Sequence, residues 1–325
     1  MGWNGSDFID ELSAKLGDTS TTFEARVLIW LNDGIKDIAT RHNWSFLRVK
    51  GKKVLTAAAE EQDLSLGTPS APTLAALAGG SLVASSVYKV LVTFYESTTK
   101  HESVSGTPSG AITPSGGNLS ITVSAIPVSS DPLVTERRIY LSKDGAAYYY
   151  YSTISNNTST TTTITAPTTS TESPPDEHSI KCLDGNPFIE NSRQLDFVSR
   201  EQMIMAIGAR FASGTPQSWC DLQEEKILLY PKPSTALTLS FYYYRIPRRV
   251  YNTISSVIDI PEWLKPDLER YVVWRGFEYR DRDGQESKQS NYETMINQTI
   301  SQKGTLKKTP RRVRDVIGNT RKQIV

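Results

Sequence analysis

Residues 22–42, TFEARVLIWLNDGIKDIATRH, form the stretch that decides the fold. Apolar side chains recur there at steps of three and four residues, which is the spacing of one helix face. Thr21, with Glu24 three residues later, is typical of a capping box. The stretch therefore predicts an amphipathic helix about 30 Å long. Its apolar face consists of Phe23, Val27, Trp30, Leu31, Ile35 and Ile38, and its polar face of Arg26, Asp33, Lys36, Asp37 and Arg41.

The segments on either side of this helix carry their own signals. A shorter helix is predicted before it, capped by Ser6 and closed by Gly17. After it, the aromatic and branched residues of 44–49 predict a strand. A second strand is predicted at 53–57, because Gly51 separates the two segments.

The composition changes at residue 67. From there to about residue 172 the chain is poor in charge and rich in Ser, Thr, Gly and Pro. Short alternating segments appear, and Asp144-Gly145 between two of them is a strong hairpin signal. Several short strands at this spacing predict a small β-sandwich, followed by a Thr-rich tract and the linker Pro174-Pro175.

Mixed structure is predicted to return after the linker. Residues 199–211 are expected to form a helix with Met203, Ile204 and Ile207 inward. Residues 227–230 and 237–245 are interpreted as two strands of one hairpin. Two helices follow, one from about Asp267 and one after Asp283-Gly284. The inward residues of the second are Tyr292, Met295, Ile296 and Ile300.

The last 24 residues, 302–325, lack a sustained period and carry eight Lys and Arg against one Asp, a net charge of +7. The whole chain has a net charge of +1, so the rest of the chain is mildly acidic. Three hypotheses stay open for this arm: a solvated tail without a role, a phosphate-neutralising contact with nucleic acid, and an arm that orders on an acidic cleft of a partner protein. Ile317, Ile324 and Val325 favour the third, because phosphate binding has no use for apolar anchors.

Composition excludes several classes of protein. No apolar run is long enough to span a membrane, and the N-terminus lacks the pattern of a signal peptide. Cys182 and Cys220 are too few for a disulfide scaffold and are expected to be free buried thiols. The 325 residues contain enough apolar material for one or two cores.

Catalytic motifs are missing from the sequence. His42, His101 and His178 do not have metal-ligand spacing, and no cofactor or metal is expected. A Cys182–His178 pair lies in a connecting segment and is not interpreted as catalytic. Asp281-Arg282-Asp283-Gly284 lacks the further ligands of a calcium loop. The phosphate-binding loop and the nucleophile elbow are absent, so we expect a protein that is not an enzyme.

The tyrosine runs 148–151 and 242–244 allow two interpretations. They could bind bases or sugars, or alternate rings could be core while the others line an interface. The second is favoured. The candidates for contact with another subunit are Trp30, Trp44, Tyr242, Tyr244, Trp263 and Trp274.

Taken together, the two flanks resemble the head-to-tail adaptor (head completion) proteins of tailed bacteriophages. The residues that carry the resemblance are Ala25 to Ala39 with His42 to Leu47, then Leu228 to Pro233 leading into Leu237 to Tyr244, then Ile260 to Leu264 and the two closing helices. The resemblance covers about residues 6–66 and 180–302. This sequence differs from the simplest members of the family because it carries the β-rich block between the two flanks. That block resembles an immunoglobulin or fibronectin type III module.

The resemblance implies an α+β fold in three parts. Residues 1–66 and 174–301 would form a discontinuous adaptor core of helices and a small β-hairpin. Residues 67–173 would be the inserted immunoglobulin-like sandwich, and 302–325 the extended arm. The arm residues expected to bind the portal are Lys303, Lys307, Lys308, Arg311, Arg312, Arg314, Ile317, Arg321, Lys322 and Ile324.

The resemblance also implies a function in the virion, at the junction of head and tail, after assembly in the host cytoplasm. The expected assembly is a ring, usually of twelve copies, below the portal protein. Tail nozzle, hub or tail fibre proteins would attach to it, and double-stranded DNA would pass through without sequence-specific binding. The alternative is a phage surface-binding or decoration protein whose β-block recognises a glycan or a host protein.

Overall fold

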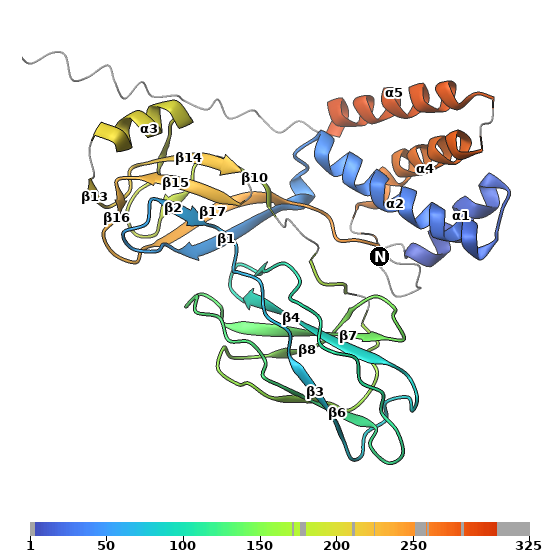
Figure 1. Ribbon diagram of the computed structural model, residues 1–325. Helices are drawn as coiled ribbons and strands as arrows, with labels where there is room; N and C mark the ends of the chain where they lie inside the picture. Colours follow the sequence, from blue (N-terminus) through green and yellow to red (C-terminus); the bar gives the residue numbers. More distant parts are fainter. Residues whose placement is uncertain are drawn as a thin grey trace, which may run out of the picture.

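The computed structural model describes residues 4–170, 172–175, 180–209, 212–223, 225–250, 258, 260–280 and 283–303. The chain is a mixed α+β protein whose sheets are mostly antiparallel, which confirms the predicted class at this level. Figure 1 shows a group of helices on the right, a layered arrangement of strands on the left, and a second β-rich part below.

The helices pack into one bundle built from both flanks. α1 (Gly5–Leu16) and α2 (Thr21–Arg41) come from the N-terminal flank. η2 (Glu262–Leu264), α4 (Lys265–Tyr279) and α5 (Gln285–Lys303) come from the C-terminal flank. α2 packs against α1 and α4, and α4 packs against α5. One apolar core joins them and includes the whole predicted apolar face of α2: Phe23, Val27, Trp30, Leu31, Ile35 and Ile38.

The helix starts differ from the predicted ones. The Asn4 side chain accepts a hydrogen bond from the Asp7 N–H at 2.8 Å, so Asn4, not Ser6, caps α1. α2 begins one residue early, with Ser20 as its N-cap and no side-chain capping bond. This places Thr21 inside the helix, and the predicted capping box is wrong. Gly17, with a φ of 77°, closes α1 as expected.

Two facing sheets form what we call the body sandwich. One consists of β1 (Arg48–Val54), β17 (Thr238–Arg245), β10 (Ile180–Leu183) and β11 (Phe188–Ile189). The other consists of β12 (Asp196–Phe197), β14 (Ser218–Gln223), β15 (Lys226–Tyr230) and β2 (Glu61–Asp63). Phe241, Tyr243 and Trp219 belong to the core that the two sheets share. The sequence predicted a small hairpin and the strands 44–49 and 53–57 but not two facing sheets, because the shortest of these strands are too brief to show a period.

The predicted hairpin of residues 227–230 and 237–245 is wrong. β15 pairs with β14 and β2, whereas β17 pairs with β1, β10 and β11 in the opposite sheet. Between them, β16 (Lys232–Pro233) pairs with β13 (Ser213–Gly214). Proline lacks an N–H donor, so Pro231 and Pro233 prevent a continuous antiparallel ladder, and the chain crosses from one sheet to the other.

The segment after α2 also differs from the prediction. Ser45–Leu47 is a short 3-10 helix, η1, and β1 runs without interruption through Gly51. A Cβ atom at Gly51 would lie 2.6 Å from the Phe241 ring. The glycine therefore makes room for that ring and does not separate two strands.

Residues 73–164 form a second pair of facing sheets, here called the inserted sandwich. β3 (Thr73–Leu77), β6 (Ser120–Ser124) and β9 (Thr162–Ile164) make one sheet. β5 (His101–Glu102), β4 (Tyr88–Glu96), β7 (Glu136–Lys143) and β8 (Tyr149–Ile154) make the other. They share an apolar core. Asp144 and Gly145 turn β7 into β8, both with positive φ, as the Asp-Gly signal predicts. Kinship with immunoglobulin or fibronectin modules stays a prediction.

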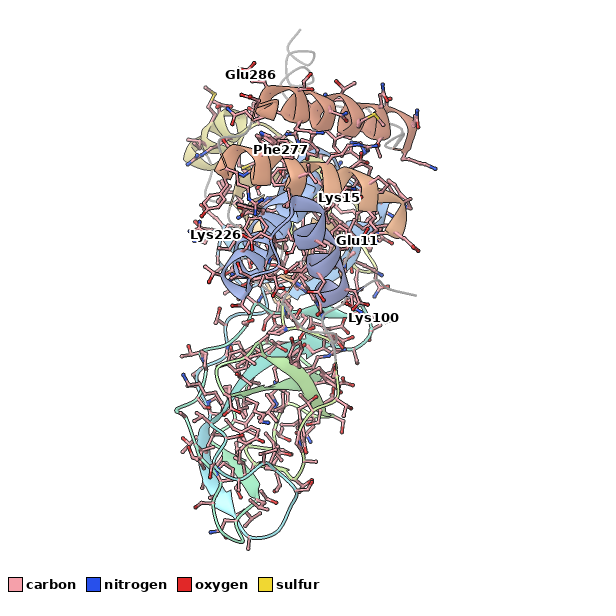
Figure 2. All side chains as sticks on the ribbon, turned by 90° about the vertical axis from the view of Figure 1, so that its right-hand side faces the viewer. Glu11, Lys15, Lys100, Lys226, Phe277 and Glu286 are labelled. Atoms are coloured by element: carbon pink, nitrogen blue, oxygen red, sulfur yellow. The ribbon has the colours of Figure 1, made fainter. Side chains whose placement is uncertain are left out.

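The two ends of the inserted sandwich lie beside one loop. The Pro69 carbonyl accepts a hydrogen bond from the Thr107 N–H at 3.0 Å, and the Pro175 carbonyl accepts one from the Ser105 N–H at 3.3 Å. Such closeness lets a domain be inserted between adjacent elements of another. Figure 2 shows the result: the helices lie at one end of the molecule, the inserted sandwich extends from the other, and Lys100 lies at the level where they meet.

α3 (Arg200–Ala209) lies against β14 and β15. Met203 is buried with Val198 and Cys220, as predicted. Ile204 is 56% exposed, so its predicted inward position is wrong. It follows Met203 directly, about 100° around the helix, and α3 meets the sheet along a narrow line. The Ile207 side chain and Phe211 lie outside the described residues.

Candidate assembly surfaces

The basic arm begins at the end of α5. Lys303, the last residue described, is exposed, and its Nζ lies 5.9 Å from the centre of the Trp263 ring. The other predicted arm residues lie outside the described residues. They are Lys307, Lys308, Arg311, Arg312, Arg314, Ile317, Arg321, Lys322 and Ile324.

Three aromatic side chains gather where the arm begins, and we call them the arm-root cluster: Trp44, Phe46 and Trp263. The Trp44 ring lies 6.1 Å from Phe46 and 5.7 Å from Trp263. Trp44 is buried, and its Nε1–H donates to the Ile38 carbonyl at 2.8 Å. Trp263 is 43% exposed. A buried indole thus supports an exposed one, which gives a rigid apolar surface beside the arm.

The predicted subunit-contact residues differ in their exposure. Trp30, Trp44 and Tyr244 are buried in the core of this chain, so their rings pack within the subunit, and their contact with another subunit stays a prediction. Their size and apolarity serve the bundle itself. Trp274 is half-buried against Tyr271 and Tyr292.

Tyr242 and Trp263 are the predicted contact residues that reach the surface. Tyr242 is 37% exposed, with the Arg48 guanidinium 4.2 Å from its ring centre. In the other tyrosine run, Tyr149 is buried and Tyr150 packs 6.0 Å from Tyr140 of this chain.

Two further apolar side chains, which were not among the predicted contact residues, are exposed near the end of α4. Ile29 of α2 and Tyr279 of α4 are exposed, and Arg26 lies 4.4 Å from the Tyr279 ring centre. Ile29 is an apolar residue two positions after Val27, outside the periodic face of its helix. An apolar residue outside the apolar face of a helix indicates an exposed apolar side chain, and this was the signal in the sequence.

An ionic network joins the inserted sandwich to the body, and we call it the joint network. Glu102 of β5 lies 3.4 Å from Arg138 of β7 and 3.3 Å from Arg248, which follows β17. Glu172 lies 2.6 Å from Arg138 and 2.9 Å from Arg248. Two carboxylates and two guanidinium groups thus meet in a partly desolvated place.

Neutral groups complete the joint network. The Thr93 and Tyr140 hydroxyls each donate to Glu102 Oε1 at 2.6 Å. Burial opposes ionisation of Glu172, but hydrogen bonds and charge from Arg248 and Arg138 hold its pKa below the usual range. Paired and hydrogen-bonded charges of this kind fix an orientation, because removing one partner leaves another buried and unpaired.

His101 lies beside this network and is 1% exposed. Its ring packs 6.1 Å from Phe241 and 5.5 Å from Tyr243 of the body sandwich. Burial lowers the pKa of His101 to about 4. Lys53 lowers it further, whereas the Lys52 backbone, Glu96 and Asp131 oppose the shift. At neutral pH the imidazole of His101 is therefore uncharged and buried between the inserted sandwich and the body sandwich.

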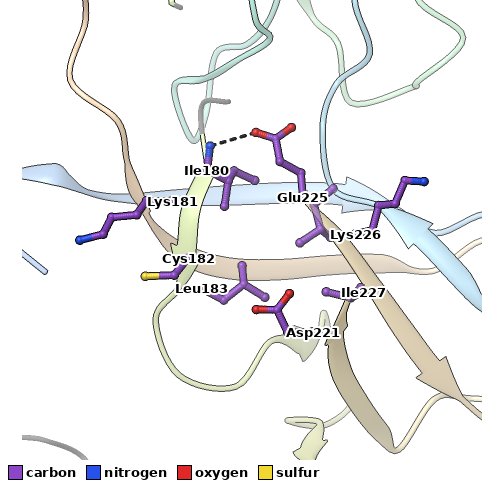
Figure 3. Close-up of a pocket in the computed structure, with 9 residues that line it drawn as sticks. Ile180, Lys181, Cys182, Leu183, Asp221, Glu225, Lys226 and Ile227 are labelled. Atoms are coloured by element: carbon purple, nitrogen blue, oxygen red, sulfur yellow. Dashed lines mark hydrogen bonds between the residues drawn. The ribbon is translucent and has the colours of Figure 1, made fainter. Parts of the chain in front are cut away.

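A small pocket of about 140 Å³ lies between β10 and β15 (Figure 3). At its edge the Ile180 N–H donates to Glu225 Oε1 at 2.9 Å. Burial raises the pKa of the Cys182 thiol, whose Sγ lies 3.6 Å from Asn43 Oδ1. A thiol that stays protonated is a poor nucleophile. His178, its suggested partner, lies outside the described residues.

The neighbouring Lys181 has a structural role. Its Nζ donates to the carbonyls of Ala39 and His42, at 2.7 and 2.9 Å. A cation at this place satisfies the last carbonyls of α2 and its negative dipole end. β10 is thereby tied to the helical bundle.

Two further features, a metal site and a membrane-spanning helix, concern the described ranges. They contain no group of three or more His, Cys, Asp or Glu side chains that could hold a metal ion. None of the helices there combines the length and apolarity that a bilayer crossing requires. Asp281 and Arg282, from the rejected calcium loop, lie outside these ranges.

Comparison with known proteins gives one assignment. The family model described as SU10 adaptor protein matches residues 136–318, more than half of the chain. The match begins within the inserted sandwich at β7, includes α3, α4 and α5, and runs beyond Lys303. The comparison with curated proteins found no match. By the extent of the family match, the chain belongs to the SU10 adaptor protein family.

Proposed function

We propose that this protein is a head-to-tail adaptor of a tailed bacteriophage. It acts structurally, without catalysis, in a dodecameric ring below the portal. The ring extends the DNA channel and provides the platform to which tail nozzle, hub or fibre proteins attach. The observation that carries the proposal is the family match, since an adaptor is by nature a structural protein of the particle.

The bundle supports a subunit that can repeat around a ring. Residues from both flanks share one core, so each copy offers a single rigid wedge. A ring needs two different contact surfaces on each subunit. For these contacts we propose exposed apolar side chains at opposite ends of α4: Trp263 of the arm-root cluster near its start, and Ile29 with Tyr279 near its end.

The basic arm is proposed to bind the portal. It leaves the bundle beside the arm-root cluster, where Lys303 already lies over an aromatic ring. A charge of +7 suits an acidic cleft between portal subunits. Repeated around a ring, weak individual contacts give strong overall binding, because each further arm binds intramolecularly. The mildly acidic remainder suits a channel through which DNA slides without base-specific contact.

A truncation tests the role of the arm. The full-length chain and a chain ending at Ser301 are mixed with purified portal rings and examined by co-sedimentation and negative-stain microscopy. We expect the truncated chain to lose portal binding at least tenfold while its circular dichroism and melting temperature stay unchanged. A matched control replaces the arm's Lys and Arg with Gln, which keeps length and removes charge. Undiminished binding by the truncated chain contradicts the arm hypothesis.

A further inference from the structure

The outer sheet of the inserted sandwich has two open edges. Its order is β3-β6-β9, so β3 and β9 each pair on one side, with β6. Among the described residues, no backbone hydrogen bond reaches the other side of either strand. An edge strand presents N–H and C=O groups that are suited to another β-strand.

These edges also lack the charges that ordinarily discourage pairing. β3 lies within residues 64–88, which contain no Asp, Glu, Lys or Arg, and β9 lies within residues 145–171, which contain none either. β3 reads TLAAL, and its residues other than Leu74 are exposed. Four exposed, uncharged residues on an edge strand form a template for strand addition unless something covers them.

Four other edge strands, β1, β2, β5 and β8, carry charge or are covered. In the body sandwich, β1 carries Arg48 and three lysines, and β2 carries Glu61 and Asp63. In the inner sheet of the inserted sandwich, β5 is buried at the joint. β8 is covered by Thr168 and Glu172, since the Thr168 hydroxyl donates to the Tyr150 carbonyl at 2.6 Å and the Tyr150 N–H donates to the Glu172 carbonyl at 2.8 Å. In this respect β3 and β9 differ from these four edge strands.

We propose that β3 of one copy pairs with β9 of the next copy, so that this sheet continues from subunit to subunit. The inference rests on the proposed ring. β3 and β9 are the opposite edges of one sheet and are different strands, so their pairing is heterologous and repeats head to tail around a rotation axis. A contact between two β3 strands would instead stop at a dimer. The joint network holds the inserted sandwich in one orientation, as a repeated contact requires.

Side-chain register supplies the positions for a test. Ala75 of β3, Thr122 of β6 and Thr163 of β9 form one row across the sheet. Ala75 and Thr163 are exposed. Within one copy they are two strand spacings apart, roughly 10 Å, which is beyond the reach of a disulfide. A disulfide between cysteines at positions 75 and 163 therefore reports contact between two copies.

Cysteine pairs test the contact in the full-length chain, assembled on purified portal rings. Ala75→Cys and Leu77→Cys are each combined with Thr163→Cys, so that two registers are covered. After mild oxidation we expect a ladder of covalent oligomers on non-reducing gels, at least tenfold above either single variant. The matched control combines Thr122→Cys with Thr163→Cys, because Thr122 lies on the central strand. Replacing Ala75 and Thr163 with Lys should lower the number of assembled rings.

The outcomes separate this inference from the proposed function. Rings without a covalent ladder overturn the pairing of β3 with β9 and leave the adaptor function intact. Dimers from Ala75→Cys by itself, without longer species, show β3–β3 pairing and also overturn it. A failure to form rings contradicts the proposed function, and this inference with it.

Discussion

A buried histidine couples the joint of the molecule to pH. The pKa of His101 is about 4 in the folded chain, against about 6.5 in an unfolded one. Below pH 6.5 the unfolded chain binds a proton that the folded chain does not. Stability therefore falls as the pH drops from 6.5 to 4, by about 3 kcal/mol in total. Chemical denaturation at a series of pH values measures this slope.

The variant His101→Phe is the matched control for that prediction. Phenylalanine fills a similar volume against Phe241 and Tyr243 and has no proton to bind. Its stability should lose most of the slope between pH 6.5 and pH 4. An identical slope in both proteins would assign the pH dependence to other groups.

Arg248 is one of the body residues that hold the inserted sandwich. Replacing it with Met keeps the stem of the side chain and leaves Glu102 and Glu172 to share Arg138. Because Glu102 is buried, we expect a loss of about 3 kcal/mol at pH 7. Urea denaturation measures it. Lys143→Met removes an exposed pair 3.9 Å long and should change stability by less than about 0.5 kcal/mol. Equal losses of stability in the two variants would contradict a stabilising role of the joint network.

At the scale of elements, the approach of α2 to α4 depends on one glycine. A Cβ atom at Gly34 would lie 2.7 Å from Tyr271 Cδ1 and 2.8 Å from Leu268 Cδ1. Gly34→Ala should destabilise the bundle by about 1–3 kcal/mol, although alanine is the better helix former. Thermal unfolding checks this. Gly110→Ala, which meets nothing within 4 Å, is the control, and a stabilised Gly34→Ala variant would show that the helices can separate at no cost.

Elements with a strong period were predictable from sequence, and those governed by distant contacts were not. The apolar face of α2 was correct because it is a local repeat. Gly51 looked like an interruption because the ring that covers it, Phe241, is far away in the chain. The crossing after β15 was missed because two adjacent strand patterns are compatible with either one sheet or two.

The candidate surfaces were also predictable from the sequence only in part. The exposed Trp263 and Tyr242 were among the aromatic candidates, but apolarity could not distinguish them from the buried Trp30. The joint network was not predicted. Its charged members, Glu102, Arg138, Glu172 and Arg248, come from four separate segments, and none has a spacing that marks it.

For the whole molecule, the inserted sandwich should be removable. Its ends lie beside one loop, and none of the described residues between Leu64 and Ile180 belongs to the cores of the bundle and the body sandwich. A chain in which a short Gly-Ser linker replaces residues 67–173 should fold, with a lower melting temperature because His101 no longer covers Phe241 and Tyr243. Circular dichroism and calorimetry measure both, and an unfolded product would contradict it.

The pairing of β1 with β17 has a consequence for synthesis. Arg48 lies opposite Tyr244, so a nascent chain exposes β1 long before its partner strand leaves the ribosome. The inserted sandwich, made in between, can complete its own core first, since domains fold as units in the order of translation. During this time β1 has no partner strand. Its three lysines disfavour pairing with strands of other nascent chains.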